Sequence, residues 1–64
     1  MATKDQIIAR MNQLEQRATE LVNLAGTYLD DGAPATAADR LRLAASTLDE
    51  LAETKATLFE RVPA

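Results

Sequence analysis

The sequence predicts an all-α protein: an antiparallel two-helix hairpin, or helix-turn-helix coiled coil, that completes a four-helix bundle by dimerisation or by docking on a partner. Apolar residues recur at alternating steps of four and three, the spacing that places them on one side of an under-wound helix. This heptad stripe is interrupted once, by the turn-forming segment Asp30-Asp31-Gly32-Ala33-Pro34. In the first half the stripe contains Ile7, Met11, Leu14, Ala18, Leu21, Ala25 and Tyr28. In the second half it contains Ala37, Leu41, Ala44, Leu48, Leu51, Lys55, Leu58 and Val62.

The first helix is expected over about residues 4–30. Thr3 and Gln6 have the spacing of a capping box, in which each side chain satisfies a free backbone N–H of the other residue. No proline interrupts the chain between this box and Pro34. Gly32 supplies the left-handed backbone conformation that commonly follows a helix, so the turn is expected at about residues 31–33.

Two starts are compatible with the second helix. Pro34 suits the first helical position, because its φ is fixed and its missing N–H would have no partner there. Thr36 followed by Asp39 is a second capping-box candidate. We expect a start near Pro34 and an end at about residue 61, before Pro63. Residues 1–64 then form a single helical-hairpin domain.

Folding the chain about Gly32 sets large side chains against small ones, as dense packing requires. The expected layers pair Leu21 with Ala44, Ala18 with Leu48, Ala25 with Leu41, and Tyr28 with Ala37. Further from the turn, larger residues meet, and these layers would widen the open end or admit a partner: Leu14 lies near Leu51, and Ile7 near Leu58.

The apolar surface is wider than one partner helix needs, since the stripe is flanked by Ile8, Val22, Leu29, Ala38, Ala45, Ala52 and Phe59. Such a width suits a helix that packs against two neighbours. A chain of this size buries only about 60% of its unfolded surface, and small domains rely on disulfides, a metal or self-association. Cysteine and histidine are absent, which leaves association. We predict an interface, with a second copy or another protein, formed by Ile7, Met11, Leu14, Leu21, Val22, Leu41, Leu48, Leu51, Leu58 and Phe59.

The sequence lacks the groups that catalysis needs. There is no histidine or cysteine, and Ser46 has no base to activate it. The Asp49 and Glu53 carboxylates lie on an expected outer face and lack the burial that is typical of catalytic carboxylates. No glycine-rich phosphate loop is present. We therefore expect a protein that is not an enzyme, with no cofactor, no metal and no small-molecule substrate.

Charge and hydropathy set further expectations. Seven basic residues stand against ten acidic ones, and the net charge of −3 disfavours nucleic acid as a partner. No stretch of about 18 residues is free of charge, so no membrane span is expected. The N-terminal residues lack the apolar segment of a signal peptide. We expect a cytoplasmic protein, alone or within a virion or larger assembly in the cytoplasm.

Two residues break the pattern. Lys55 occupies a stripe position, either because its stem lies along the core edge with its charge in water or because a buried polar group fixes register and oligomeric state. Gly26 sits inside the first helix on an outward position, either as a tolerated imperfection or to allow close approach by another chain.

Charged residues outside the stripe also have two interpretations. Asp49, Glu50, Glu53 and Glu60 make an acidic outer face, which is either solvated or a surface for a basic partner. Arg10 and Arg17 flank the stripe one heptad apart, a position that favours pairing with acids across a helix interface over gripping phosphate.

The middle of the chain resembles one tetratricopeptide repeat, in the spacing of Leu21, Leu24, Ala25, Tyr28, Gly32, Ala37, Leu41 and Ala44. The resemblance covers about half the chain, but Asp49 replaces the usual closing proline and both expected helices are too long for the repeat. It implies an antiparallel helix pair and not membership of that family. In size and outline the chain is also similar to the Rop family of plasmid RNA-binding dimers, to small hairpin chaperones of bacterial secretion systems, and to small virion and anti-defence proteins of phages.

These observations lead to one expected function and two alternatives. The first is a small non-enzymatic assembly or adaptor protein, or structural subunit, that acts through its apolar heptad face; its size would suit a phage or a bacterium. The second is a homodimeric RNA-binding regulator of the Rop type, which needs Arg10 and Arg17 on one face. The third is an inhibitor that covers a basic surface of a host protein with its acidic face.

Overall fold

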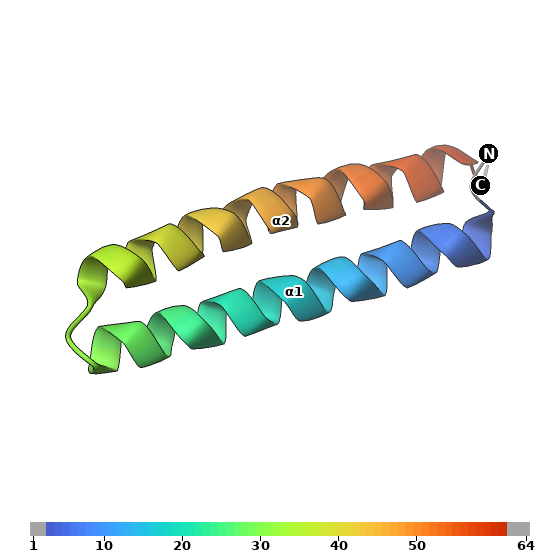
Figure 1. Cartoon of the computed structure of the whole chain (residues 1–64). Coiled ribbons are helices and arrows are strands. Elements are labelled where there is room, and N and C mark those ends of the chain that lie inside the picture. The colour runs from blue at the N-terminus through green and yellow to red at the C-terminus, as the bar shows by residue number, and fades with distance from the viewer. Residues whose placement is uncertain (1–2, 62–64) are drawn as a thin grey trace.

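The computed structural model describes residues 3–61 and consists there of two α-helices, with no strand in this range. Helix α1 spans Lys4–Asp30 and helix α2 spans Pro34–Arg61. The helices lie side by side and antiparallel, joined by one short turn (Figure 1). The all-α hairpin is therefore confirmed, and the bounds of both helices agree with the expected ranges. Val62 and Pro63 lie outside the described residues.

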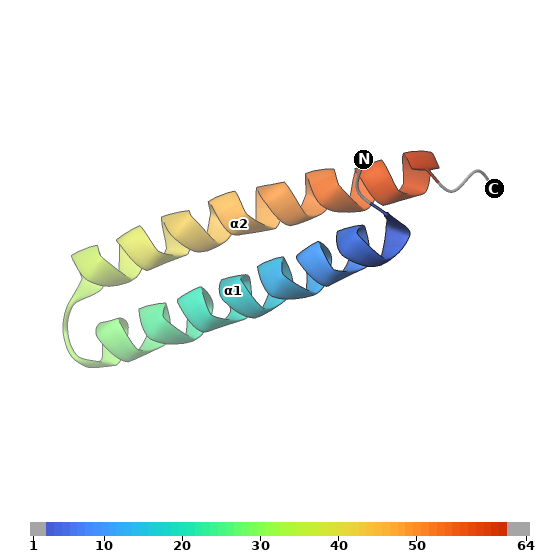
Figure 2. The ribbon, with the colours of Figure 1, turned by 45° about the vertical axis from the view of Figure 1, so that its right-hand side comes forward.

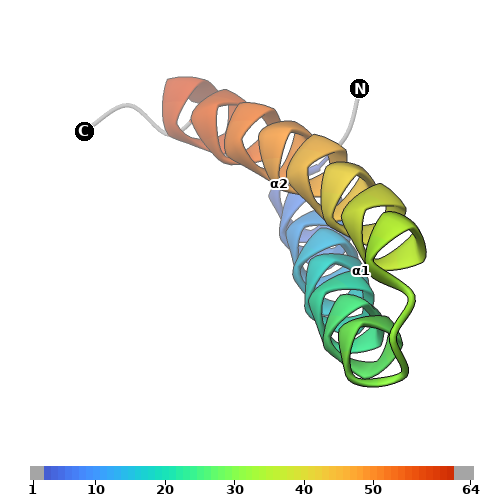
Figure 3. The ribbon, with the colours of Figure 1, turned by 90° about the vertical axis from the view of Figure 1, so that its left-hand side faces the viewer.

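The hairpin is long and thin, with extents of 48 × 19 × 14 Å. The two helices stay adjacent along their whole length, as the view turned by 45° shows (Figure 2). Seen from the end that carries the turn, α2 lies above α1 (Figure 3). Because residues 3–61 form only two helices, each has a single neighbour in this range, and both broad sides of the hairpin face outward.

The N-terminus of α1 is fixed by the predicted capping box. Thr3 has extended backbone angles, with φ −76° and ψ 164°. Its Oγ1 accepts a hydrogen bond from the backbone N–H of Gln6 at 3.2 Å, and the Gln6 Oε1 accepts one from the backbone N–H of Thr3 at 2.8 Å. Two backbone donors that the helix itself cannot satisfy thus have partners.

The turn is built around Gly32, whose φ is +81°. The backbone N–H of Gly32 donates to the carbonyl of Leu29 at 3.1 Å, and that of Ala33 donates to the carbonyl of Tyr28 at 2.8 Å. These bonds cap carbonyls at the end of α1 in the manner of a helix C-terminal motif. Pro34 then begins α2, and Thr36 lies within that helix, so the alternative start at Thr36 is not used.

The core of the hairpin is asymmetric. From α1 it takes three large side chains, Ile7, Leu14 and Leu21, together with Ala18 and Ala25. From α2 the fully buried residues in the described range are two alanines, Ala37 and Ala44. Large side chains of α1 thus face small ones of α2, which lets the two helices approach closely.

The stripe on α2 is not a buried seam as the spacing predicted. Leu41 remains 50% exposed and Leu48 48% exposed, while Leu51 and Leu58 are partly buried. The physical reason is that α1 covers only one side of α2, the side that carries Ala37 and Ala44. The alternate stripe positions therefore lie at the edge of the contact and look outward.

Candidate protein-interaction face

One broad side of the hairpin carries six of the eight large apolar side chains that are exposed in the described range. Near the turn it forms a surface groove between the helices, which we call the turn-end groove. This groove is lined on α1 by Val22, Ala25, Gly26 and Leu29 and on α2 by Pro34, Ala37, Ala38 and Leu41. Its walls are leucine and valine and its floor is alanine and glycine, so it presents bulky ridges around a hollow.

The same side continues toward the open end of the hairpin. A second groove, lined by Ala18, Thr19, Val22, Asn23 and Leu48, adjoins the first through Val22. By heptad spacing the same side also carries Ile8, two heptads before Val22, and Phe59, three heptads after Ala38. Glu15 lies between Ile8 and Val22 and interrupts the apolar residues with one exposed charge. We call this side the apolar face and define it by its large exposed side chains, Ile8, Val22, Leu29, Leu41, Leu48 and Phe59.

These side chains retain much of their surface. Their exposed fractions run from 38% for Ile8 to 68% for Phe59. Scattered exposed leucines are ordinary, but a concentration of large apolar side chains on one side of a small protein marks a binding surface. The grooves also join the partners expected from the predicted layers: Ala18 and Leu48 share one groove, and Ala25 and Leu41 share another.

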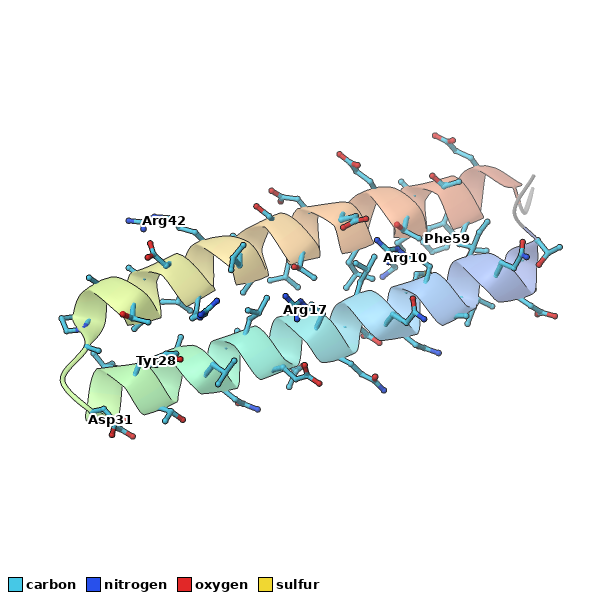
Figure 4. All side chains as sticks on the ribbon, viewed as in Figure 1. Arg10, Arg17, Tyr28, Asp31, Arg42 and Phe59 are labelled. Atoms are coloured by element: carbon cyan, nitrogen blue, oxygen red, sulfur yellow. The ribbon has the colours of Figure 1, made fainter. Side chains whose placement is uncertain are left out.

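The opposite broad side is polar. There Arg10 forms an ion pair with Glu50 across the two helices, as the sequence predicted for this arginine. Arg10 and Arg17 both point toward α2 (Figure 4), in a groove that also contains Gln13, Leu14 and Thr47. Nearer the turn, the Arg40 guanidinium lies over the Tyr28 ring at 5.9 Å from its centroid. We call this side the polar face.

Two of these arginines are thus engaged within the chain itself. The Arg10 charge is matched by Glu50, and the charge of Arg40 is placed over an aromatic ring. Arg17 makes no ion pair with any side chain in the described range. Of the three arginines on the polar face, only Arg10 therefore has its charge matched by a carboxylate in the described range.

The expected acidic outer face of α2 is smaller than its sequence suggested, because Glu50 turns toward α1. Asp49, Glu53 and Glu60 remain exposed. On the same helix Arg42 pairs with Asp39 at 2.7 Å and points away from α1 (Figure 4). Such exposed pairs between neighbouring turns contribute little to stability.

The predicted interface residues fall into three groups. Ile7, Leu14 and Leu21 are at most 5% exposed, so α2 already covers them and they have little surface to offer a second protein. Met11, Leu51 and Leu58 are partly buried. The remaining four, all on the apolar face, are exposed: Val22, Leu41, Leu48 and Phe59.

Two large residues of the apolar face, Ile8 and Leu29, were not in the predicted interface set. They lie next to the stripe, one position after Ile7 and Tyr28. The signal that could have identified them was present, since the apolar flank repeats at intervals of seven. What the spacing alone could not give was the side from which α2 covers α1.

The two residues that break the heptad pattern are both on this side of the hairpin. Lys55 is exposed, with its Nζ 6.0 Å from the centroid of the Phe59 ring. This position agrees with the interpretation in which the charge stays in water. Gly26 lines the turn-end groove, and a Cβ added there would meet no atom of the chain within 4 Å. The chain itself therefore gives no reason for a glycine at this position.

Over residues 3–61 no group of three or more potential metal-ligating side chains comes together. No helix there is long and apolar enough to cross a bilayer.

The chain matches no protein-family model, no curated protein and no solved structure. Its function therefore has to be argued from the surfaces described above.

Proposed function

We propose that this protein is a non-enzymatic assembly or adaptor protein that acts by packing its apolar face against a helical surface of another polypeptide chain. The observation that carries the proposal is the asymmetry between its two broad sides. One side exposes six large apolar side chains, whereas the other exposes two, Leu24 and Leu43, and joins the helices through polar contacts. An amphipathic helix pair with one open apolar side is the arrangement by which helices dock in grooves and bundles.

The energetics support a docking role. Completing the burial of one half-exposed leucine contributes about 1 kcal/mol. Six such side chains together reach a few kcal/mol, which is comparable with the roughly 3–5 kcal/mol that the core of so small a domain supplies. Covering the apolar face would thus decide whether the hairpin is a stable structure. We therefore interpret the apolar face as a binding surface and not as a feature that merely lowers solubility.

The two alternative functions have less support. An RNA-binding regulator needs several free cations on one face, but Arg10 is paired with Glu50 and Arg40 lies over Tyr28, so that Arg17 alone of the three is without such a contact in the described range. An inhibitor that uses acidic residues would leave the apolar face uncovered, with no role for its exposed leucines. Each alternative therefore explains fewer of the described features.

The proposal can be tested by comparing two residues of matched exposure. Val22 is 46% exposed and lies on the apolar face, whereas Leu24 is 45% exposed and lies off it. A photo-crosslinking side chain is placed at either position, and the protein is irradiated in the cells that produce it. We expect a discrete crosslinked polypeptide from position 22, of whatever mass, and none from position 24.

The adduct should also disappear when Leu48→Glu is combined with the crosslinker at position 22, since that change places a charge within the apolar face. Equal adducts from positions 22 and 24, or none from either, would contradict a docking role for this face.

A further inference from the structure

We infer that the occupant of the apolar face is a second copy of this chain, placed antiparallel to the first with the two turns at opposite ends of a four-helix bundle. This inference rests on the proposed function and names the partner for it. It is carried by the area of the face, by the positions of its ridges and hollows, and by its charges.

The area of the face suits a second copy. The hairpin is 48 Å long and 19 Å wide, which bounds the area of its broad side at about 900 Å². A specific, stable interface buries roughly 800 Å² on each partner. A second hairpin has the same length and width and can cover the whole broad side, whereas a single helix of about 10–12 Å diameter covers little more than half of its width. The interface of a two-fold dimer must also complement itself, because both copies present the same surface.

The ridges and hollows of the face lie at opposite ends. Phe59 and Ile8, its bulky residues at the open end, are separated by most of the hairpin from the turn-end groove with its floor of alanine and glycine. Phe59 lies near the open end in Figure 4. A copy turned end for end therefore brings bulky residues over a hollow.

The helix bounds give the register of this contact. When two antiparallel copies overlap along their full length, their α2 helices lie side by side and run in opposite directions. A residue n positions after the start of α2 in one copy then lies level with the residue n positions before the end of α2 in the other. Phe59 is two residues before the end of α2 at Arg61, so it lies level with Thr36, between groove residues Pro34 and Ala37.

The same count applies to α1. Ile8 is four residues after the start at Lys4, and Gly26 is four residues before the end at Asp30. Ile8 of each copy thus lies level with Gly26 of the other. This contact gives Gly26 a role that the isolated hairpin does not, since a Cβ there would meet nothing within the chain but would meet the second copy.

The arrangement with both turns at the same end is less favourable. It would set Phe59 beside Ile8 of the other copy, so that large side chains crowd each other at the open end. It would also leave the two turn-end grooves facing each other, with no large side chain to fill the space between them. It would also place the two Lys55 side chains at one level, with like charges across the bundle. In the opposite-end arrangement the two Lys55 residues are separated by about 22 Å along the axis, at 1.5 Å per residue.

Disulfide crosslinking distinguishes these arrangements, and the chain has no cysteine of its own to interfere. Ala45 and Ala52 both lie on the flank of α2 that continues from Ala38. Opposite-end packing brings Ala45 of one copy close to Ala52 of the other, whereas same-end packing brings it close to Val22. Chains carrying Ala45→Cys are therefore refolded and oxidised together with chains carrying either Ala52→Cys or Val22→Cys.

We expect a disulfide-linked dimer from the Ala45→Cys and Ala52→Cys mixture, and loss of this product when Val22→Cys replaces Ala52→Cys. The reverse pattern would overturn the arrangement while leaving the docking role intact. Absence of any association between copies, over the whole accessible concentration range, would overturn the second copy as occupant. The photo-crosslinking experiment at position 22 would then decide the docking role separately, through an adduct heavier than two chains.

A second variant tests the contact with Gly26 without cysteines. Gly26→Leu adds a good helix former where the chain has open space, so a hairpin acting alone would gain helix stability. In the opposite-end dimer the new side chain would collide with Ile8 of the other copy. We therefore expect Gly26→Leu to weaken dimerisation at least tenfold, a change in the dissociation constant that sedimentation measures directly. Unchanged or tighter dimerisation would overturn the proposed register.

Discussion

Replacing Leu48 with glutamate is expected to convert the protein from a helical assembly into a largely unfolded monomer. Leu48 is 48% exposed in the hairpin and borders the second groove of the apolar face. Once a partner covers this face, the glutamate would lie in an apolar contact with no cation beside it. Burying an unpaired carboxylate costs several kcal/mol, so the association fails. Because the hairpin core is small, loss of association removes most of the helix.

Leu43→Glu provides the matched control. Leu43 is 45% exposed, on the same helix and of the same residue type, but it lies outside the apolar face. We expect Leu43→Glu to keep the oligomeric mass and the far-ultraviolet circular dichroism of the unchanged protein. If Leu48→Glu and Leu43→Glu were equally mild, or equally disruptive, the two sides of the hairpin would not differ in function as we argue.

Leu21→Ala is expected to be the most damaging truncation within the hairpin itself. Leu21 is 3% exposed, the least exposed of the large side chains in the described range. Truncating a buried leucine costs about 2–5 kcal/mol, through lost burial and the cavity left behind. The core of a domain this small contributes only about 3–5 kcal/mol to the free energy of unfolding, so this one change removes most of that stability.

Urea unfolding followed by circular dichroism measures the effect, and two further variants make it specific. Leu21→Met keeps the volume and should cost less than about 1.5 kcal/mol. Leu29→Ala, at a side chain that is 62% exposed, should lower the stability of the assembly but by less than Leu21→Ala. If Leu21→Ala unfolded at the same urea concentration as the unchanged protein, the described core would be wrong.

The architecture could be predicted from the sequence because local signals and long-range pattern agree. Thr3 and Gln6 set the start of α1, Gly32 sets the turn, and Pro34 sets the start of α2. Between these points the apolar spacing has no break, so no other element competes. Large residues of α1 also meet alanines of α2 as the layers required.

The candidate site could be predicted only in part. The spacing identified a stripe, but it could not show that α2 presents Ala37 and Ala44 to α1 and leaves Leu41 and Leu48 at the edge. That choice depends on how the two helices rotate against each other, which is set by the fit of large side chains against small ones. The same rotation buried Ile7, Leu14 and Leu21 and exposed Ile8 and Leu29.

The polar contacts could likewise be predicted only in part. The position of Arg10 beside the stripe predicted an ion pair across the helices, and its partner is Glu50. That Glu50 leaves the acidic outer face to form this pair does not follow from heptad position alone. It depends on the level at which the two helices face each other, which the turn fixes.

We expect this hairpin to be stably folded only when its apolar face is covered. Sedimentation equilibrium over a wide concentration range, with circular dichroism of the same samples, measures the mass and the helix content together. We expect a helical dimer of twice the 6.9 kDa chain mass, which loses helix as it dissociates on dilution. A fully helical monomer whose melting temperature does not change with concentration would contradict it.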